Sequence, residues 1–348
     1  MSAAPEAGTA PGPRAPTPPG PAVPRTRRGH PLAALVARRL GAAVAVVLVV
    51  SVLVFLATEL APGDAATARL SRTGGGSPAQ LAALRHTLGL DVPMANRYLR
   101  WLGDALRGDL GVSYAQGRAV TSVIGDRALN SLVLGVVSAV VLVPSALGLG
   151  LWSGRRAGRG ADRAVSASVL VLVSVPEFVI GTLLVLCFAT GLGWLPAVSA
   201  LSAGQSPLGH PALLVLPVLT LVSSCLAQNV RIVRAATVRA ERGDAVEAAR
   251  LGGVPEWRVL LRWVVPAAVV PVIPVMARYV SYLLGGTLIA ETLFGYPGLG
   301  ALLVDASAGR DAPLVLAVSV LLTCVTVALN LVADVLSVLL NPARGSGT

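Results

Sequence analysis

The sequence has 348 residues, of which 54% are hydrophobic and only 13% are charged, and its mean hydropathy is +0.74. Soluble domains carry about 25% charged residues, so this composition excludes an ordinary soluble protein and predicts a chain that crosses a membrane several times. All the basic side chains behind the net charge of +11 are arginines, because the chain contains no lysine. A nucleic-acid-binding protein would gather them on one face with stacking aromatic residues, whereas here aromatic residues make up 4% and the arginines flank apolar runs. Without lysine there is no Walker A loop, so ATP hydrolysis by that route is also excluded.

The three cysteines lie inside apolar runs, and the three histidines are scattered along the chain. Cysteines in such surroundings are expected to be small buried hydrophobic side chains, and neither residue type has the spacing of a disulfide framework or a metal site. The sequence therefore predicts no metal, no cofactor and no catalytic site. The residues concerned are Cys187, Cys225, Cys324, His30, His86 and His210.

The N-terminal segment, residues 1–31, contains nine prolines together with glycine, alanine and arginine. Such a composition cannot form a packed core, so we predict a disordered tail. The first apolar run, at about 40–60, follows Arg38 and Arg39. Its roughly 20 residues suffice to cross a hydrocarbon layer of ~30 Å, and it is expected to be an uncleaved first span.

The rest of the chain is predicted to form one membrane domain over residues 32–342, followed by a short tail at 343–348. A long polar stretch at 61–128 is expected to be an external loop, and a second polar loop lies at 234–263. Prolines inside several apolar runs predict bent helices, which bundles tolerate. Six spans are predicted, at about 40–60, 129–152, 164–192, 212–233, 264–290 and 314–340.

Arginine is distributed unevenly between the loops that join these spans. If the N-terminus is cytoplasmic, the arginines of the tail, of the 153–163 turn and of the 234–263 loop all lie in the cytoplasm, where positive loops are favoured. The 193–211 loop carries no arginine. The eight arginines of the external loop weigh little, because long loops are translocated largely regardless of charge. We therefore predict a multi-pass plasma-membrane protein with both termini in the cytoplasm.

The 234–263 loop is rich in helix-forming residues and contains Gly252, Gly253 and Pro255 near its middle. These residues predict a short helix, a turn and a second helix. Glycine adopts the left-handed conformation that ends many helices at little cost, so Gly253 is expected at the turn. A helix–turn–helix of this kind suits docking onto a partner protein at the membrane surface.

The same loop carries a recognisable spacing. Glu247, Ala248 and Ala249 are followed by Gly253 six residues after the glutamate and by Pro266 thirteen residues after that glycine. This arrangement resembles the EAA loop of bacterial ABC importer permeases. The resemblance implies a cytoplasmic coupling helix that sits in a cleft of an ATP-hydrolysing subunit, with these five residues as the coupling site.

Four further motifs occur in a fixed order: Ala-Pro-Gly-Asp at 61–64, Leu-Gly-Leu-Asp-Val-Pro at 88–93, Gly-Asp-Leu-Gly-Val-Ser at 108–113, and Glu-Thr-Leu-Phe-Gly-Tyr-Pro-Gly-Leu-Gly at 291–300. Together they resemble the dipeptide, oligopeptide and nickel permeases of bacterial ABC importers. The resemblance implies an all-α membrane protein with the type I ABC importer fold and no ATPase site of its own. It also implies a second homologous permease subunit, two ATP-binding ATPase subunits and an extracellular solute-binding protein as partners, in a lipid bilayer and without nucleic acid.

Two ionisable residues fall inside predicted spans. Glu177 lies 14 residues beyond Arg163, and Arg278 lies 16 residues beyond Arg262. At ~1.5 Å per residue both would lie about 21–24 Å deep if the helices were straight. Charges at such depth face a partner or water, so one hypothesis is that the two pair across the bundle or line the solute path. The alternative is that the Glu177 and Arg278 side chains each reach a water-filled cavity or a subunit interface separately.

A different class of function is an ion-coupled secondary transporter, which would place its chemistry on intramembrane groups such as Glu177 and Asp334. Transporters of that class usually show inverted repeats, and the sequence has no convincing internal repeat. The favoured interpretation is therefore the permease subunit of an ABC importer for peptides or related small solutes. Dipeptides, longer peptides, nickel chelates and glycosides all fit it equally.

Overall fold

The computed structural model describes residues 31–72, 74–202, 205–285 and 287–339. The predicted tails therefore lie outside the described residues, apart from Pro31. Within the described part the chain is helical, with a single isolated β-bridge between Val112 and Ala119. The predicted all-α class is confirmed.

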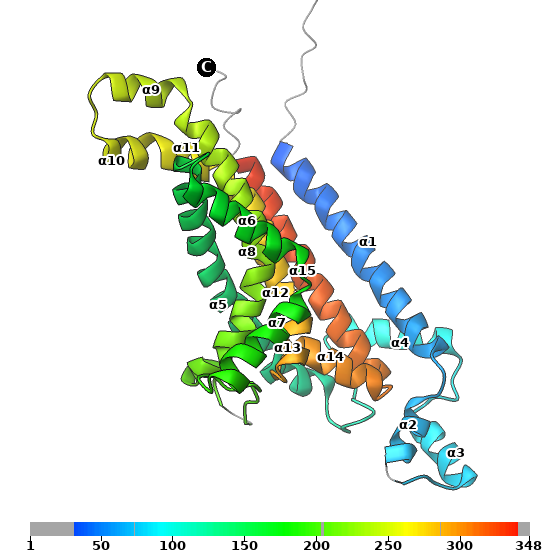
Figure 1. Cartoon of the computed structure of the whole chain (residues 1–348). Coiled ribbons are helices and arrows are strands. Elements are labelled where there is room, and N and C mark those ends of the chain that lie inside the picture. The colour runs from blue at the N-terminus through cyan, green and yellow to red at the C-terminus, as the bar shows by residue number, and fades with distance from the viewer. Residues whose placement is uncertain (1–30, 73, 203–204, 286, 340–348) are drawn as a thin grey trace, which may run out of the picture.

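Four long apolar helices dominate the fold (Figure 1): α1 (Pro31–Leu60), α5 (Val120–Arg155), α8 (Pro211–Glu241) and α15 (Ala312–Leu339). Apolar runs form helices in a membrane because the helix satisfies every backbone hydrogen bond within the segment. A fifth stretch, Ile273–Leu293, is also long and apolar enough to cross a membrane. A bent pair of helices supplies a sixth candidate span, as the sequence predicted.

The bent pair occupies the third span, predicted at 164–192, one of the spans whose internal prolines predicted a bend. Helix α6 (Gly160–Ser174) and helix α7 (Glu177–Leu184), which continues as a π-helix over Val185–Gly191, meet at an angle of 106°. The break comes at Pro176, which has no N–H to donate and forces the residue before it into extended backbone. Val175 accordingly has φ −97° and ψ 127°.

The fifth predicted span, at 264–290, is also interrupted. Helix α10 (Glu256–Val259), a π-helix at Leu260–Val264 and α11 (Val265–Val269) run up to a turn, after which α12 (Ile273–Gly285) begins. The short helices α13 (Leu288–Leu293) and α14 (Leu299–Ala308) then lead into α15. Pro271 lies in the turn and Pro274 in the first turn of α12, where a missing N–H costs little.

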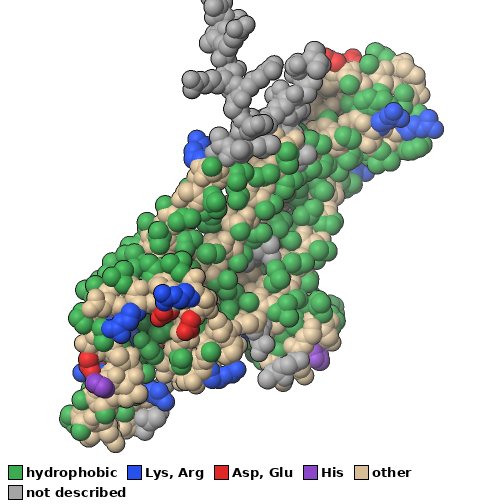
Figure 2. Space-filling model, turned by 180° about the vertical axis from the view of Figure 1, so that it is seen from behind, with side chains coloured by type: hydrophobic (Ala, Val, Ile, Leu, Met, Phe, Trp, Pro, Cys, Tyr) green, Lys and Arg blue, Asp and Glu red, His purple; other side chains and the backbone are tan. Residues whose placement is uncertain are grey.

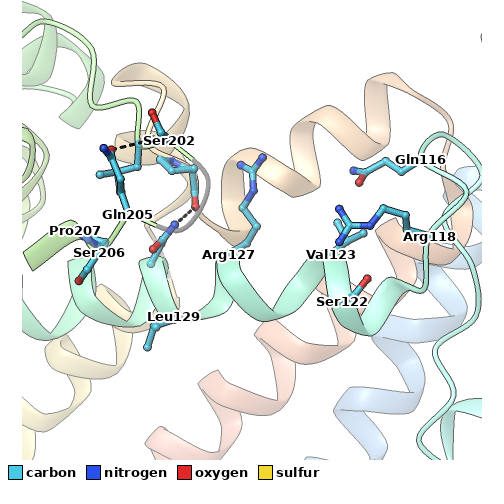
Figure 3. A pocket seen from close by; sticks show the side chains of 13 residues that line it. Gln116, Arg118, Ser122, Val123, Arg127, Leu129, Ser202, Gln205, Ser206 and Pro207 are labelled. Atoms are coloured by element: carbon cyan, nitrogen blue, oxygen red, sulfur yellow. Dashed lines mark hydrogen bonds between the residues drawn. The ribbon is translucent and has the colours of Figure 1, made fainter.

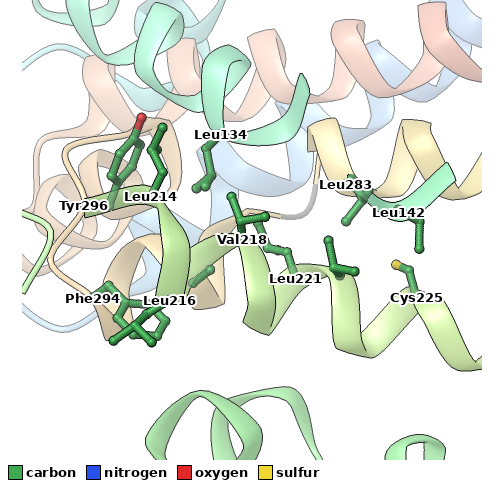
Figure 4. Packing of buried hydrophobic residues seen from close by; sticks show 12 residues of the cluster. Leu134, Leu142, Leu214, Leu216, Val218, Leu221, Cys225, Leu283, Phe294 and Tyr296 are labelled. Carbon is green, nitrogen blue, oxygen red and sulfur yellow. The ribbon is translucent and has the colours of Figure 1, made fainter. Parts of the chain in front are cut away.

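Helices α5 and α8 pack together more closely than any other long pair. Gly150 and Gly154 of α5 face α8, and a Cβ on them would lie 2.5 Å from Val233 and 2.6 Å from Thr237. Small residues four apart let two backbones approach closely, which is how helices associate when lipid surrounds them. A buried cluster continues this contact toward the other end of the bundle (Figure 4). It comprises Leu134 and Leu142 of α5, Leu214, Leu216, Val218, Leu221, Val222 and Cys225 of α8, and Leu283, Ala290, Phe294 and Tyr296.

Helix α1 lies at the edge of the bundle, beside α15 (Figure 1). Its far end meets α4 (Met94–Ala105), where the rings of Phe55 and Tyr98 are 5.3 Å apart and Ser51 Oγ lies 2.8 Å from Tyr98 Oη. The helices α2 (Ala65–Arg72) and α3 (Pro78–Thr87) extend beyond this end of α1. They belong to the polar loop predicted at 61–128.

The start of α1, the end of α15 and helix α9 (Asp244–Leu251) all lie at one end of the molecule (Figure 1). This arrangement requires an even number of crossings between the two ends of the described chain. Figure 2 shows a mostly hydrophobic shaft with charged side chains gathered toward its two ends. Such a surface is that of a multi-pass membrane protein.

Candidate functional site

The predicted helix–turn–helix is present in the 234–263 loop. Helix α9 ends at Leu251, and α10 begins at Glu256 after Pro255, which precedes its first turn. Gly253 has φ +73°, and a Cβ added to it would meet nothing within 4 Å. The turn therefore needs glycine for its backbone conformation and not for lack of space. The prediction of a left-handed residue at Gly253 is confirmed.

A small apolar core holds α9 back against the chain that follows it. Val246, Val259 and Val264 are buried at its centre, with Ala249 and Trp263 packed around them. The loop is thus a folded unit with its own core. Its orientation is set by its two ends, which continue into α8 and α11.

Four charged side chains at the base of this loop form one cluster. Arg250 binds Glu256 through Nε at 2.9 Å and Glu241 through Nη2 at 2.5 Å, while Arg155 binds Glu241 at 3.2 Å and Glu256 at 3.4 Å. The Arg250 guanidinium holds the pKa of the Glu256 carboxyl below its usual value. The cluster joins α5 and α8 to both helices of the loop. Arg250 and Glu256 become neighbours only once α9 has folded back, so their spacing in the sequence gave no signal.

The coupling residues predicted from the sequence lie around this unit. Glu247 and Ala248 are exposed, Ala249 is half-buried and Pro266 is exposed on α11. Large apolar side chains on the loop also point outward: Leu251 is 82% exposed, Trp257 59% and Leu261 60%. An exposed apolar surface on a polar loop is typical of a protein-binding site.

A buried ion pair fixes α6 to α8 just before the loop. Arg234 donates from Nε to Asp162 Oδ1 at 2.5 Å and from Nη2 to Oδ2 at 2.7 Å, and the Gly158 amide donates to the same carboxylate at 2.9 Å. Asp162 is only 2% exposed. The forked, two-bond geometry gives both strength and a defined orientation. Arg234 therefore holds α6, the first half of the bent span, in place against α8.

Glu291 is a fully buried carboxylate, at 0% exposed. Its Oε1 accepts hydrogen bonds from Ser131 Oγ and Thr287 Oγ1, both at 2.6 Å, and its Oε2 accepts from the amides of Gly300 at 2.6 Å and Ala301 at 3.2 Å. The carboxylate thus ties α5 to the start of α14. Nothing in the sequence around Glu291 indicates this role, because its partner Ser131 lies 160 residues away.

The glycines of this motif make room for the carboxylate. A Cβ on Gly298 would lie 2.2 Å from the carboxyl carbon of Glu291, and one on Gly300 would lie 2.5 Å from Leu288 Cα. Both distances are impossible for a real Cβ. The turn between α13 and α14 is therefore built around the buried glutamate.

Two more carboxylates hold the polar loop at 61–128. Asp311 accepts hydrogen bonds from Ser113 Oγ and from the amides of Tyr114 at 3.0 Å and Ala115 at 3.1 Å. Asp64 accepts from the Thr67 amide at 2.8 Å and from Arg85 Nε at 2.7 Å. The conspicuous loop motifs at 61–64 and 108–113 are thus anchoring points, one of them directly on the start of α15.

A polar cavity of about 440 Å³ opens at the same end of the molecule (Figure 3). Arg127 rises from α5 into it, between the loop that carries Ser202 and Gln205 and the turn that carries Gln116 and Arg118. Among the described residues, no acidic side chain lines this cavity. It therefore favours anionic or carboxylate-bearing groups.

Glu177 and Arg278 are not brought together. Glu177 begins α7 immediately after the bend, is half-buried, and has Ser224 and Cys225 of α8 and Tyr282 of α12 as neighbours. Its Oε1 is buried and has no hydrogen-bond partner within the described part of the chain. Arg278 instead binds Asp334 Oδ1 at 3.2 Å.

The predicted pairing of these two residues is therefore wrong for this structure. The depth arithmetic assumed straight helices, whereas the third span bends by 106° just before Glu177 and the fifth breaks just before α12. The ion-coupled transporter interpretation also loses support. Asp334, one of its two candidate groups, is neutralised by Arg278 and by Arg39.

Possible metal ligands are sparse: over the described ranges no three His, Cys, Asp or Glu side chains gather in a way that could hold a metal ion. Most of the buried carboxylates described above already bind arginines, hydroxyls or backbone amides. They serve as joints between helices.

The chain is similar to known membrane components of transport systems over most of its length. Residues 146–345 match the family of binding-protein-dependent transport system inner membrane components, and residues 32–135 match the N-terminal region of such membrane components. A probable peptide ABC transporter permease of Sinorhizobium fredii is 31% identical over 311 residues, which cover 89% of this chain and 99% of that protein. The glutathione transport system permease protein GsiC of Escherichia coli is 36% identical over 309 residues, covering 88% and 97%, and its Salmonella paratyphi A counterpart matches equally well.

The enclosed geometry of Glu291 leads to a stability prediction. Glu291→Ala removes the acceptor of two buried backbone amides, each worth roughly 1–3 kcal/mol, and leaves a cavity as well. We expect a loss of about 3 kcal/mol or more, seen as earlier thermal unfolding of the detergent-solubilised protein by tryptophan fluorescence. Asp305→Ala is the matched control, because Asp305 is an exposed carboxylate on α14. Unfolding temperatures for the two variants within about 2 °C of each other would contradict the clamp role.

Proposed function

The chain belongs to the family of binding-protein-dependent transport system inner membrane components, and we propose that it is the membrane-spanning permease subunit of an ATP-driven importer. Residues 32–342 would form the permease domain. The solute class we propose is peptides and small peptide-like compounds, because the relatives are named for peptide and glutathione transport. The observation that carries the proposal is the folded 244–266 unit, with its outward apolar side chains beside the Glu-Ala-Ala sequence.

The partners follow from this role. We propose that Glu247, Ala248, Ala249, Gly253 and Pro266 belong to a coupling site that docks on one of two ATPase subunits. A second, homologous permease subunit would complete the membrane pathway. An extracellular binding protein would deliver the solute at the opposite end, where the arginine-lined cavity opens.

Helix α8 gives this docking site a direct connection to the interior of the bundle. It runs unbroken from Pro211 to Glu241, despite Pro217 inside it. At one end Glu241 belongs to the charged cluster of the loop, and in its middle Ser224 lies beside Glu177. A movement imposed on α9 would therefore be passed along a rigid rod to the bend between α6 and α7.

Glu177 is our candidate for the solute path. Its unpartnered buried oxygen leaves an acceptor open in the middle of the bundle, and buried acceptors without partners are costly. A solute that brings a cationic amino group would supply the missing donor. Arg278, the other residue predicted to line the path, forms an ion pair with Asp334 instead.

The proposed orientation places both chain ends and the coupling site in the cytoplasm, on the strength of the arginine distribution. In a background without native cysteines, Ala79→Cys on α3 should react with a membrane-impermeant thiol reagent applied to intact cells. Ala245→Cys on α9 should react only after the cells are opened. Both positions are exposed, so access is limited by the membrane alone. Labelling of Ala245→Cys from outside would reverse the orientation and remove the coupling role.

The coupling site can be tested at Gly253. Left-handed backbone costs an ordinary residue about 1–2 kcal/mol, but asparagine tolerates it. Because there is open space around Gly253, Gly253→Asn should keep the turn while Gly253→Val should distort it. We expect the valine variant to insert normally but to lose most ATPase co-purification and solute uptake, and the asparagine variant to keep most of both. Glu247→Lys, which reverses a charge at the docking surface, should resemble the valine variant. Normal uptake by Gly253→Val and Glu247→Lys at normal expression would refute the assignment.

Glu177→Gln tests the solute path. The amide keeps the size of the side chain but removes the charge, so uptake of amino-bearing peptides should fall several-fold while ATPase subunits stay bound. The neighbouring Phe178, 56% exposed on the outer side of α7, supplies the control as Phe178→Leu. If uptake is unchanged in Glu177→Gln, or falls equally in both variants, Glu177 does not contact the solute.

A further inference from the structure

A cavity of about 400 Å³ lies between α1, α12 and α15, away from the coupling site. Its polar lining consists of Arg39, Arg278, Asp334 and Asn330. The remaining wall is apolar and comes from alanine, valine and leucine side chains of α1 and α15. The cavity therefore has a charged part and an apolar part.

The charges of this cavity do not balance. Asp334, with a side chain only 9% exposed, receives Arg39 Nε at 3.0 Å and Arg278 Nη2 at 3.2 Å. One carboxylate thus serves two guanidinium groups, which leaves one positive charge and most of their N–H donors without a partner in the described residues. The side chains of Arg39 and Arg278 remain 49% and 62% exposed. The side chain of Asn330, exposed beside them, likewise makes no hydrogen bond within the described ranges.

The depth of the cavity is that of the polar margin of a bilayer. Arg39 is eight residues from the start of α1, and Asp334 is five residues from the end of α15, or about 12 Å and 8 Å along the helices. Both positions are also close to the ends of the apolar stretches Val36–Leu60 and Ala312–Leu336. The uncompensated charge therefore lies where phospholipid headgroups meet the hydrocarbon.

We propose that this cavity binds the phosphate headgroup of an anionic phospholipid in the leaflet that surrounds the start of α1. Arg39 and Arg278 would hold the phosphate, since guanidinium groups match its geometry with paired hydrogen bonds. An acyl chain would lie along Val46 and Leu331. Basic pockets between helices on the cytoplasmic side are known to take such headgroups, and the proposed orientation puts this cavity on that side.

The lipid has a structural consequence for α1. Only 11% of the most apolar window of that helix is buried against the rest of the chain, and its main neighbour is α15. A lipid wedged between α1, α12 and α15 would fill the gap and fix the angle of α1. This inference does not depend on which solute is transported.

The test uses the full chain purified in detergent with whatever subunits accompany it. Retained phospholipids are identified by mass spectrometry, and thermal stability is measured with added phosphatidylglycerol, phosphatidylcholine or inorganic phosphate. We expect retained phosphatidylglycerol and stabilisation by that lipid alone. The double variant Arg39→Gln with Arg278→Gln should retain at least about tenfold less phosphatidylglycerol than the parent, because each arginine near an anionic lipid contributes to binding. Arg38→Gln, which does not line the cavity, should behave like the parent.

Ala43→Phe keeps the ion pairs but fills the cavity, so it should also expel the lipid. This variant controls for the possibility that the double variant loses lipid only because it misfolds. Equal lipid retention in parent, double variant and Ala43→Phe would overturn the proposal, as would stabilisation by inorganic phosphate alone. It would also fail if the double variant shed a second permease subunit with its lipid unchanged, because the cavity would then be a subunit contact. Reduced uptake by Arg278→Gln at unchanged lipid content would return Arg278 to the solute path.

Discussion

The contact between α5 and α8 supports almost everything else in the structure. In a lipid environment helices gain little from hiding apolar side chains from one another, and close packing with hydrogen bonding takes over. Gly150 and Gly154 allow that packing, and both helices then carry the joints to their neighbours. Arg234 of α8 holds α6 through Asp162. Arg155 of α5 and Glu241 of α8 hold the 234–263 loop, and Ser131 of α5 donates a hydrogen bond to Glu291.

Buried and half-buried carboxylates recur as the joints of this molecule, and each joins segments that are far apart in the sequence. Glu291 connects the turn before α14 to α5, Asp311 connects the 61–128 loop to α15, and Asp334 connects α1 to α12. Each acidic group has several donors, which offsets the cost of removing its charge from water. Glu177 is the exception, since one of its oxygens has no donor in the described structure. That contrast is why Glu177 stands out as a functional candidate among otherwise structural acids.

The sequence predicted those parts of the fold that a single local property determines. Apolar runs indicated the membrane spans, and the glycines at 252–253 indicated the turn of the 234–263 loop. Proline was a poorer guide: Pro144 and Pro217 lie inside continuous helices, whereas Pro176 ends one and bends the span by 106°. Whether a proline breaks a helix depends on neighbours that can satisfy the freed backbone, which the local sequence does not show. The depths calculated for Glu177 and Arg278 were wrong because they assumed straight helices, whereas the third span bends by 106°. The hydrogen bonds of Glu291 could not be predicted, because Ser131 lies 160 residues away from it in the sequence.

The two groups of ion pairs near the 234–263 loop differ in their exposure to solvent. The cluster of Arg155, Glu241, Arg250 and Glu256 lies at the surface, with side chains 17–59% exposed, whereas the Asp162 side chain in the joint to Arg234 is 4% exposed. Mobile ions screen exposed charges over about 8 Å at physiological ionic strength but act weakly on buried pairs. Rising salt therefore loosens the attachment of the loop to the bundle before it affects the bundle itself. The stiffness of this joint is set by the ionic strength of the medium around it.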